Sequence, residues 1–325
     1  MSAIVTITFN PAIDKYTTID SLIPEKKLRC SSPSYEAGGG GVNVARVIKR
    51  LGKNVQAIYM AGGYNGQLLH QLLNKEQIHS IPINIKDETR ENITVLDKSN
   101  NQQYRFCLPG PVIEKNKLEE FFSYLTKIDD VKFIIASGSL PPGMQSDVFA
   151  KIALIARQKK AKFIVDTSGE SLRKALEEGV YLLKPNRNEL AYLIGKDNLP
   201  DKDIEDAARQ IIQKNKCMAI VVSLGSSGAL LVTKDISQFI TAPPVTVKST
   251  VGAGDSMLAG IVFSLSAGNN FLEAAKYGVA CGTAAVINEG TQLCKKDDAD
   301  RLFELIDKNN PEISINKKTL PALSD

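Results

Sequence analysis

The 325-residue chain contains no tryptophan, only two histidines and only five cysteines, and these scarcities exclude several classes of protein. With His70 and His79 alone, a histidine-rich metal centre cannot form. A Ser-His-Asp triad is not formally excluded, but only these two histidines could supply its base. The cysteines are odd in number and include no C-x-x-C pair, which favours a reducing cytoplasm over a disulfide framework or a zinc site. They are Cys30, Cys107, Cys217, Cys281 and Cys294.

The chain also lacks a strong excess of charge and a long apolar run. It has 40 basic and 36 acidic residues, a formal net charge of +4, which is too small to indicate a nucleic-acid or polyanion binder. No apolar run approaches the ~20 residues that span a membrane. The start, "MSAIVTITFNPAIDK", has no basic segment followed by a long apolar stretch, so no signal peptide is expected. These features predict a cytoplasmic protein without a nucleic-acid or membrane partner.

What the sequence does contain is a regular alternation of short β-rich runs with helical patterns. With 43% apolar residues, a chain of this length can bury a large core, in one α/β domain or two. The helical patterns, with apolar residues three and four apart, cover residues 41–52, 147–161 and 203–216. Such alternation predicts an α/β fold with a doubly wound, mostly parallel sheet flanked by helices. The predicted strands are 3–9, 55–62, 132–139, 162–168, 180–186 and 218–225.

Two segments interrupt this alternation and define the expected domain organisation. Residues 13–33 and 89–108 read as β-strands joined by polar turns, with a hairpin in the second around "DKSNNQ". We expect them to form a small β-sheet lid at the working edge of the main sheet. Residues 1–12, 34–88 and 109–308 then make up the α/β domain, and 309–325 form a polar C-terminal tail.

Asp255 follows a glycine-rich turn in "TVGAGDSMLAG". Gly252 and Gly254 precede a helix that is expected to begin near Asp255, and the helix start would offer unpaired N–H groups to a phosphate or an oxyanion. Asp255 could then accept a proton from an attacking nucleophile, or it could be an ordinary first-turn residue that stabilises the helix. The local pattern alone favours the second reading. The apolar face of the helix is Met257, Leu258, Ile261, Val262 and Leu265.

A second glycine cluster, residues 38–41, precedes the helical pattern "VNVARVIKRLG". Four consecutive glycines cost conformational entropy unless the backbone approaches a ligand closely or adopts positive φ, and a flexible turn would need fewer. The cluster lacks the third glycine of a dinucleotide fingerprint, and no G-x-x-x-x-G-K-[ST] motif occurs in the chain. An NAD-dependent oxidoreductase and a P-loop NTPase are therefore poorly supported.

Taken together, these motifs resemble the PfkB (ribokinase-like) family of sugar kinases. Two glycine-rich signatures carry the resemblance, "GGGGVNVARVIKRLG" (38–52) and "STVGAGDSMLAG" (249–260). The match extends from residue 1 to about residue 308. Shorter motifs fall in the family's order around the signatures: "PEKKLRC", "YRFCLPG", "SGSLPPG", "VDTSGE", "KPNRNEL" and "VVSLGSSGAL".

The resemblance implies a catalytic role for the turn that precedes the C-terminal helix. Asp255 matches the family's catalytic base, and Gly252, Ala253 and Gly254 match the anion hole for the transferred phosphoryl group. Phosphoryl transfer depends more on positioning and charge neutralisation than on a strong base. Because the helix dipole is expected to keep the pKa of Asp255 low, this carboxylate would orient the sugar hydroxyl and take its proton late.

The resemblance also implies binding of ATP and Mg²⁺. Asn186 and Glu189 match an N-x-x-E motif that holds Mg²⁺ and the phosphates, although on their own they would be read as helix-capping residues. "SSG" by itself could be a tight turn, and Lys27, in the lid, is a weaker candidate that could act across a dimer interface. The full set of positions that match ATP contacts is Lys27, Lys184, Asn186, Ser223, Gly225, Gly228 and Thr283.

On the sugar side, hydroxyl-binding and phosphate-binding residue types stand at the matching positions. An arginine suits a phosphate through charge-assisted bonds, and aspartate and asparagine suit sugar hydroxyls. The substrate positions are Asp14, Gly39, Gly40, Asn43, Arg90, Ser139 and, more weakly because of its exposed strand, Arg105. The resemblance further implies a K⁺ site. Gln292 stands at a position of that site where similar members of the family have an arginine. The K⁺ positions are Ser249, Val251, Ala285, Asn288, Gly290 and Gln292.

The activity implied is ATP-dependent phosphorylation of fructose 6-phosphate at its 1-hydroxyl, a glycolytic step, by a homodimer whose lids pair. Related kinases act on tagatose 6-phosphate or form fructose 1,6-bisphosphate from fructose 1-phosphate, and they commonly carry a lysine at the position of Gly40. That difference favours fructose 6-phosphate, and a single phosphate contact can change discrimination by orders of magnitude. A non-catalytic sugar-phosphate sensor on the same fold is disfavoured by the joint presence of Asp255, Asn186 and Glu189.

Overall fold

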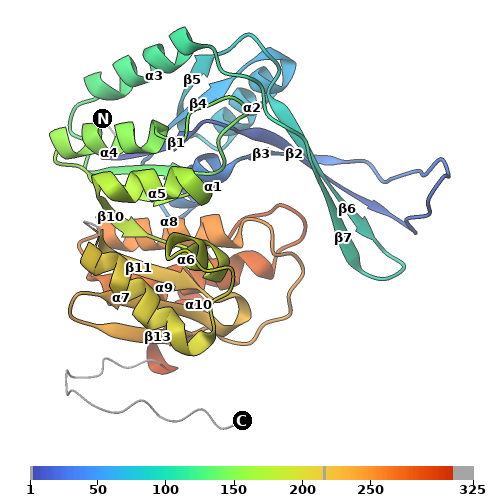
Figure 1. Ribbon diagram of the computed structural model, residues 1–325. Helices are drawn as coiled ribbons and strands as arrows, with labels where there is room; N and C mark the ends of the chain where they lie inside the picture. The colour runs from blue at the N-terminus through green and yellow to red at the C-terminus, as the bar shows by residue number, and fades with distance from the viewer. Residues whose placement is uncertain (1–2, 215–216, 310–325) are drawn as a thin grey trace.

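A computed structural model describes residues 3–214 and 217–309 (Figure 1). A large sheet with helices on both faces forms the body, and a small sheet projects from one side of it. This architecture confirms the predicted α/β fold with a mostly parallel main sheet and a separate small sheet. The predicted tail, 309–325, lies outside the described residues except for Asn309, the last residue of helix α10.

The large sheet has nine strands in the order β13-β12-β11-β10-β9-β8-β1-β4-β5. The strands from β11 to β5 are parallel to their neighbours, and β12 and β13 add an antiparallel edge. β10 ends two residues before Pro185, which has no N–H to continue the ladder. The strands are β1 (Ile4–Thr8), β4 (Gln56–Ala61), β5 (His79–Asn84), β8 (Phe133–Ser137), β9 (Lys162–Asp166), β10 (Val180–Leu183), β11 (Cys217–Ser223), β12 (Gly228–Thr233) and β13 (Ser237–Thr241).

Helices cover both faces of this sheet, so its central strands are buried on both sides and read as continuous apolar runs. One apolar core lies under α1, α2, α8, α9 and α10, and a second lies under α3 to α7. The helices are α1 (Gly40–Arg50), α2 (Gly63–Lys75), α3 (Lys115–Lys127), α4 (Val148–Gln158), α5 (Gly169–Glu178), α6 (Arg187–Leu193), α7 (Ile204–Lys214), α8 (Ala253–Ser266), α9 (Phe271–Val286) and α10 (Lys296–Asn309), with short 3₁₀ turns at Asp201–Asp203 and Gly225–Ser227.

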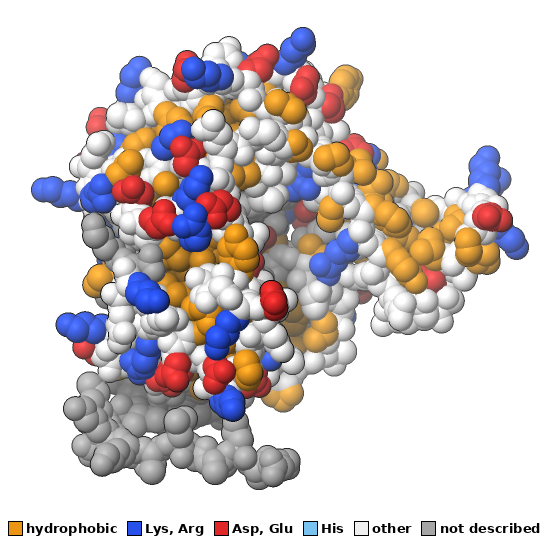
Figure 2. Space-filling view, in the orientation of Figure 1, with side chains coloured by type: hydrophobic (Ala, Val, Ile, Leu, Met, Phe, Trp, Pro, Cys, Tyr) orange, Lys and Arg blue, Asp and Glu red, His pale blue; other side chains and the backbone are white. Residues whose placement is uncertain are grey.

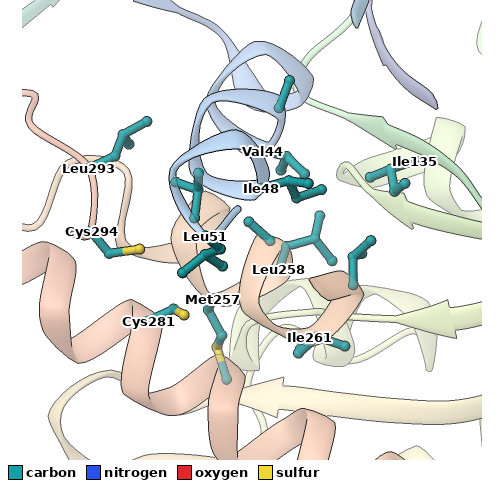
Figure 3. Close-up of a cluster of buried hydrophobic side chains, with 14 of the residues drawn as sticks. Val44, Ile48, Leu51, Ile135, Met257, Leu258, Ile261, Cys281, Leu293 and Cys294 are labelled. Carbon is teal, nitrogen blue, oxygen red and sulfur yellow. The ribbon is translucent and has the colours of Figure 1, made fainter. Parts of the chain in front are cut away.

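Helix α8 differs from the sequence expectation in where it begins and in how it is buried. It starts at Ala253, two residues before Asp255, because Gly252 adopts a left-handed conformation and becomes its N-cap. Instead of one apolar face, nearly all of the helix after its first turn is buried, because α1 and α9 both pack on it (Figure 3). At Gly260 a Cβ atom would lie 2.6 Å from the Cys281 sulfur, so the absence of a side chain permits the close approach of α8 and α9.

The small sheet has the order β3-β2-β6-β7, with β2 (Ala12–Ile19), β3 (Ser34–Gly38), β6 (Arg90–Asp97) and β7 (Gln102–Cys107). β6 and β7 form the predicted hairpin. β3 also belongs to this sheet, although the boundary at residue 34 assigned it to the α/β domain. Because side chains alternate across a strand, Asp14, Asn92 and Arg105 share one face of the sheet, and Tyr35, Ile93 and Phe106 share the other.

Candidate active site

The two glycine clusters of the sequence begin two helices that pack side by side. Gly39 and Gly252 are the N-caps of α1 and α8, with φ angles of 105° and 72° that side chains rarely adopt. Asn43, in the first turns of α1, donates from its amide to the Asp255 carboxylate at 2.8 Å. Residues that are 212 positions apart thus meet at the carboxyl edge of the main sheet, where α/β proteins place their sites.

Asp255 is more basic than an ordinary aspartate. Its pKa is raised to about 6, chiefly by burial; the Asn43 hydrogen bond opposes this rise and the nearby Asp166 carboxylate adds to it. The low pKa expected from the helix dipole is therefore wrong. The cost of removing the carboxylate from water exceeds the gain from the helix N-terminus, and a pKa near neutrality suits a general base.

The start of α8 has the properties of an anion-binding turn. No side chain caps the helix, so first-turn N–H groups lack an intrahelical acceptor. A Cβ atom at Gly252 would lie 2.4 Å from a terminal methyl group of Leu293, so a side chain there would have to displace Leu293 as well as adopt a positive φ. A Cβ atom at Gly254 would lie 3.5 Å from the ammonium nitrogen of Lys184. A lysine and several N–H donors therefore converge beside Asp255.

Lys184 is buried and paired with Asp166, a residue that the sequence reasoning missed. The Lys184 Nζ lies 3.3 Å from the Asp166 carboxylate. Burial alone would lower the pKa of Lys184, but the carboxylates of Asp166, Asp255 and Glu189 outweigh it and raise that pKa. Its position in the sequence could have indicated a role in the site, because Asp166 is the last residue of β9 and lies within the motif "VDTSGE".

The N-x-x-E pair forms the capping box that its local pattern allowed. The Asn186 side chain accepts from the Glu189 N–H, and the Glu189 carboxylate accepts from the Asn186 N–H, both at 2.9 Å. Burial raises the pKa of Glu189, and the nearby Asp166 carboxylate raises it further. A concentration of negative charge beside α6 is favourable for a divalent cation, so capping and metal binding are compatible functions of the same pair.

A cavity of about 740 Å³ adjoins the start of α8. It is lined by apolar side chains of the 242–247 segment and of α9, together with Ala253 and Gly254. Lys27 lies in the exposed loop between β2 and β3 and is not among the lining residues. The predicted nucleotide-binding residues that do line the cavity are Ser223, Gly225, Gly228 and Thr283.

Arg90 and Asp14 meet through Asn92, another residue that sequence reasoning missed. The Asn92 amide donates to Asp14 at 2.8 Å, and its carbonyl oxygen accepts from Arg90 at 3.0 Å. Burial lowers the pKa of Arg90. All the hydrogen bonds that Arg90 donates within the described part of the chain go to uncharged oxygens of Asn10, Asn92 and Leu108. Its charge remains available for an anion.

The remaining predicted sugar residues are partly brought together. Ser139 accepts a hydrogen bond from the Asn10 side-chain amide, and the Asn10 backbone carbonyl accepts from Arg90, so Asn10 joins the two. Gly40 has no room for a side chain, because a Cβ atom would lie 2.4 Å from the Ser137 hydroxyl. Arg105 is not joined to this group; its guanidinium donates to the Thr250 hydroxyl at 2.8 Å.

The six predicted K⁺ positions lie on two chain segments that are bonded to each other. The Ser249 N–H donates to the Val286 carbonyl at 3.3 Å, and Asn288 and Ser249 are buried. Within the second segment the buried Thr291 hydroxyl has no hydrogen-bond partner. A buried, oxygen-rich pair of segments with an unsatisfied hydroxyl fits a monovalent cation. The positions themselves remain a prediction.

The described residues offer neither a ready-made metal cluster nor a membrane-spanning helix. No group of three or more His, Cys, Asp or Glu side chains there could hold a metal ion by itself. No helix in that part of the chain combines the length and the apolar character needed to cross a membrane. All five cysteines are free thiols, as expected for a chain without a disulfide framework.

Comparison with protein families identifies the chain. The sequence pattern of the pfkB family of carbohydrate kinases matches residues 4–298. This span includes both glycine-rich helix starts, Asp255 and the small sheet. The chain belongs to this family. It is accordingly a carbohydrate kinase, a phosphotransferase of a family that uses ATP. A ribokinase from Arabidopsis thaliana, 18% identical with a TM-score of 0.74, shares the fold.

Among curated relatives, this pfkB kinase is similar to ATP-dependent 6-phosphofructokinase isozyme 2 of Escherichia coli and of Mycobacterium tuberculosis. The identities are 37% (95% of this chain, 100% of the relative) and 40% (93% and 89%). It is also 33% identical to a tagatose-6-phosphate kinase of Staphylococcus epidermidis, over 94% of this chain and 98% of the relative. The structure of E. coli phosphofructokinase-2 in complex with potassium has a TM-score of 0.90 and 37% identity, covering 94% of this chain and 99% of that chain.

Proposed function

We propose that this pfkB kinase transfers the terminal phosphoryl group of ATP to the 1-hydroxyl of fructose 6-phosphate and produces fructose 1,6-bisphosphate. The observation that carries the proposal is the arrangement at the start of α8. A basic carboxylate, uncapped N–H donors and a buried lysine meet there at Asp255, Gly252–Gly254 and Lys184. Base, anion hole and positive charge are the three requirements of phosphoryl transfer to an alcohol.

In this mechanism each group has one task. Asp255, held by Asn43, accepts the proton of the attacking hydroxyl, and its pKa of about 6 keeps it mostly ionised at neutral pH. The first turn of α8 and Lys184 stabilise the negative charge of the transferred group. Asn186 and Glu189 would hold Mg²⁺ beside the phosphates of ATP, where the ion would supply neutralisation of the phosphate charge.

Arg90 and Gly40 support fructose 6-phosphate as the acceptor. Arg90, oriented by three uncharged oxygens, is suited to hold the 6-phosphate while Asp14, Asn43 and Ser139 face the sugar hydroxyls. Gly40 excludes the lysine that the resemblance associates with kinases of other sugar phosphates, since even a Cβ atom would meet Ser137. The identity is also higher to the 6-phosphofructokinases than to the tagatose-6-phosphate kinase.

We further propose a homodimer that pairs through the small sheet. On one face of that sheet, Tyr35 and Phe106 are 44% and 49% exposed. Hydrophobic side chains gather on the projecting small sheet (Figure 2), as is typical of an interaction surface. The relative in E. coli is described in a tetrameric inhibited form, so self-association occurs in the family. Lys27, on the loop of the same sheet, would then reach ATP in the partner's site.

A coupled assay with MgATP and three sugar phosphates tests the proposed function. The purified chain should have its highest kcat/KM with fructose 6-phosphate. Faster turnover of fructose 1-phosphate or tagatose 6-phosphate would reassign the substrate. Binding of fructose 6-phosphate without any ADP formation would instead identify a non-catalytic sugar-phosphate sensor.

A further inference from the structure

Strand β7 of the small sheet is bonded directly to the chain segment that leads into the anion-binding turn. The Gln103 amide donates to the Lys248 carbonyl at 3.3 Å, and its carbonyl oxygen accepts from the Ser249 hydroxyl at 3.3 Å. Two positions further along the same face of β7, Arg105 donates to Thr250 at 2.8 Å. Three consecutive residues are thus held by two alternating residues of the lid.

The held segment is hydrogen-bonded both to the start of α8 and to the 740 Å³ cavity lined by predicted nucleotide-binding residues, here called the nucleotide cavity. The Ser249 hydroxyl accepts from the Val251 N–H at 3.3 Å, directly before the Gly252 N-cap. Lys248 and Ser249 donate from their N–H groups to the carbonyl of Val286, which lines the nucleotide cavity. A displacement of β7 would therefore be transmitted to the anion-binding turn through a short chain of hydrogen bonds.

The contact between Gln103 and this segment includes a buried residue and uses both polar atoms of the Gln103 side chain. Ser249 is 4% exposed, whereas Lys248 and Thr250 on either side of it are exposed. The amide nitrogen and the carbonyl oxygen of the Gln103 side chain each form a hydrogen bond with this segment. A shorter side chain at this position would lose both hydrogen bonds. At its other end the sheet carries Asp14 and Arg90, the predicted sugar-phosphate residues.

From this arrangement we infer that Gln103 is a positioning residue that couples sugar-phosphate binding to nucleotide binding. The inference rests on the proposed function, because it assigns the two ends of the small sheet and of α8 to the two substrates. Sugar phosphate that binds to the lid and fixes its position also fixes the position of residues 248–251. Because these residues lead into the anion-binding turn, that turn is fixed as well. By reciprocity, a bound nucleotide tightens the sugar-phosphate site by the same factor.

Calorimetric titration of the full chain with fructose 6-phosphate tests this coupling without turnover. Each titration is run with and without Mg²⁺ and adenylyl imidodiphosphate, an ATP analogue that is not hydrolysed. The wild-type Kd should tighten at least about fivefold with the analogue, the lower end of ordinary couplings. In Gln103→Ala the ratio should fall below about twofold, while the Kd without nucleotide and the melting temperature stay nearly unchanged.

Gln102→Ala is the matched control, since Gln102 precedes Gln103 on β7 and points to the other face. It should keep the wild-type ratio. Gln103→Glu keeps the acceptor for Ser249 but not the donor for Lys248, so it should lose part of the ratio, and it decides the question if the alanine variant does not fold.

A wild-type ratio in the folded position-103 variants, or a wild-type chain whose sugar-phosphate Kd ignores the analogue, overturns the coupling and leaves the kinase assignment intact. A wild-type chain that binds no fructose 6-phosphate overturns the proposed substrate and the coupling together.

Discussion

Asp255 is the third residue of α8, and its carboxylate meets the Asn43 amide in a largely desolvated site. The glycines around it could be read from the sequence, because left-handed φ and tight approach demand them. Its pKa could not, because burial depends on how α1, β9 and β10 close around the carboxylate. The same holds for Asp166, Asn10 and Asn92, whose roles are set by partners far away in sequence.

The pH dependence of turnover should report the raised pKa of Asp255. A general base acts only when ionised, and kcat/KM reports the free enzyme, so kcat/KM for fructose 6-phosphate should fall about tenfold per pH unit below a midpoint near 6. Initial rates with saturating MgATP and fructose 6-phosphate well below its KM, between about pH 5 and pH 8, measure it. An acid limb centred near pH 4, the value of an ordinary aspartate, would contradict the desolvated environment.

Arg90→Ala should weaken sugar-phosphate binding selectively. A charge-assisted contact in a partly desolvated site is lost, so the KM for fructose 6-phosphate should rise about 10- to 100-fold. The KM for MgATP serves as an internal control and should change little, because Arg90 lies on β6, away from the residues that line the nucleotide cavity. If the sugar-phosphate KM is unaltered, Arg90 is a structural residue of the small sheet.

At the scale of whole elements, helix α6 combines a structural and a proposed functional role in one motif. The spacing Asn-x-x-Glu recurs in this chain at Asn270 and Glu273, where it caps α9. The local pattern therefore predicts a helix start in both places and cannot distinguish them. What distinguishes Asn186 and Glu189 is that β10 and β9 bring Lys184 and Asp166 beside them.

Glu189→Gln should separate the two roles of α6. Glutamine at this position still completes a capping box, so the free energy of unfolding should change by less than about 0.5 kcal/mol. The Mg²⁺ concentration at half-maximal rate should rise several-fold, because a carboxylate near the phosphates is lost. Glu273→Gln at the start of α9 is the matched control and should leave the Mg²⁺ requirement unchanged. Equal Mg²⁺ requirements in both variants would leave Glu189 with a capping role alone.

The strands and helices of the main sheet could be predicted well because each has its own periodicity. Two features could not. Helix α8 has apolar residues on nearly all sides because two helices pack on it, and the arrangement of neighbours is not a local property. β3 reads as the entry to the glycine cluster, but its hydrogen-bond partner is β2 of the small sheet.

At the scale of the whole molecule, the small sheet presents a polar face with Asp14, Asn92 and Arg105 and an opposite face with exposed aromatic residues. If the aromatic face pairs with a second copy, Phe106→Arg should shift the chain from dimer to monomer in sedimentation velocity, because the interface would bury an unpaired charge. Phe239→Arg, at a similarly exposed position on β13, should remain dimeric. A Phe106→Arg chain that stays dimeric would place the interface elsewhere.

The most direct test of the account is the turnover of Asp255→Asn with MgATP and fructose 6-phosphate. Asparagine fills the same space but cannot accept the proton, so kcat should fall by about 10²- to 10⁴-fold. Because the folded-state pKa of Asp255 lies above its unfolded value, its carboxyl stabilises the fold at low pH and loses that contribution as pH rises through about 6. At pH 8 the melting temperature of the variant should therefore be no lower than that of the wild type. Its free energy of unfolding should exceed the wild-type value by at most about 3 kcal/mol. A stable variant that retains more than about a tenth of the wild-type kcat would contradict the assignment of Asp255 as the base.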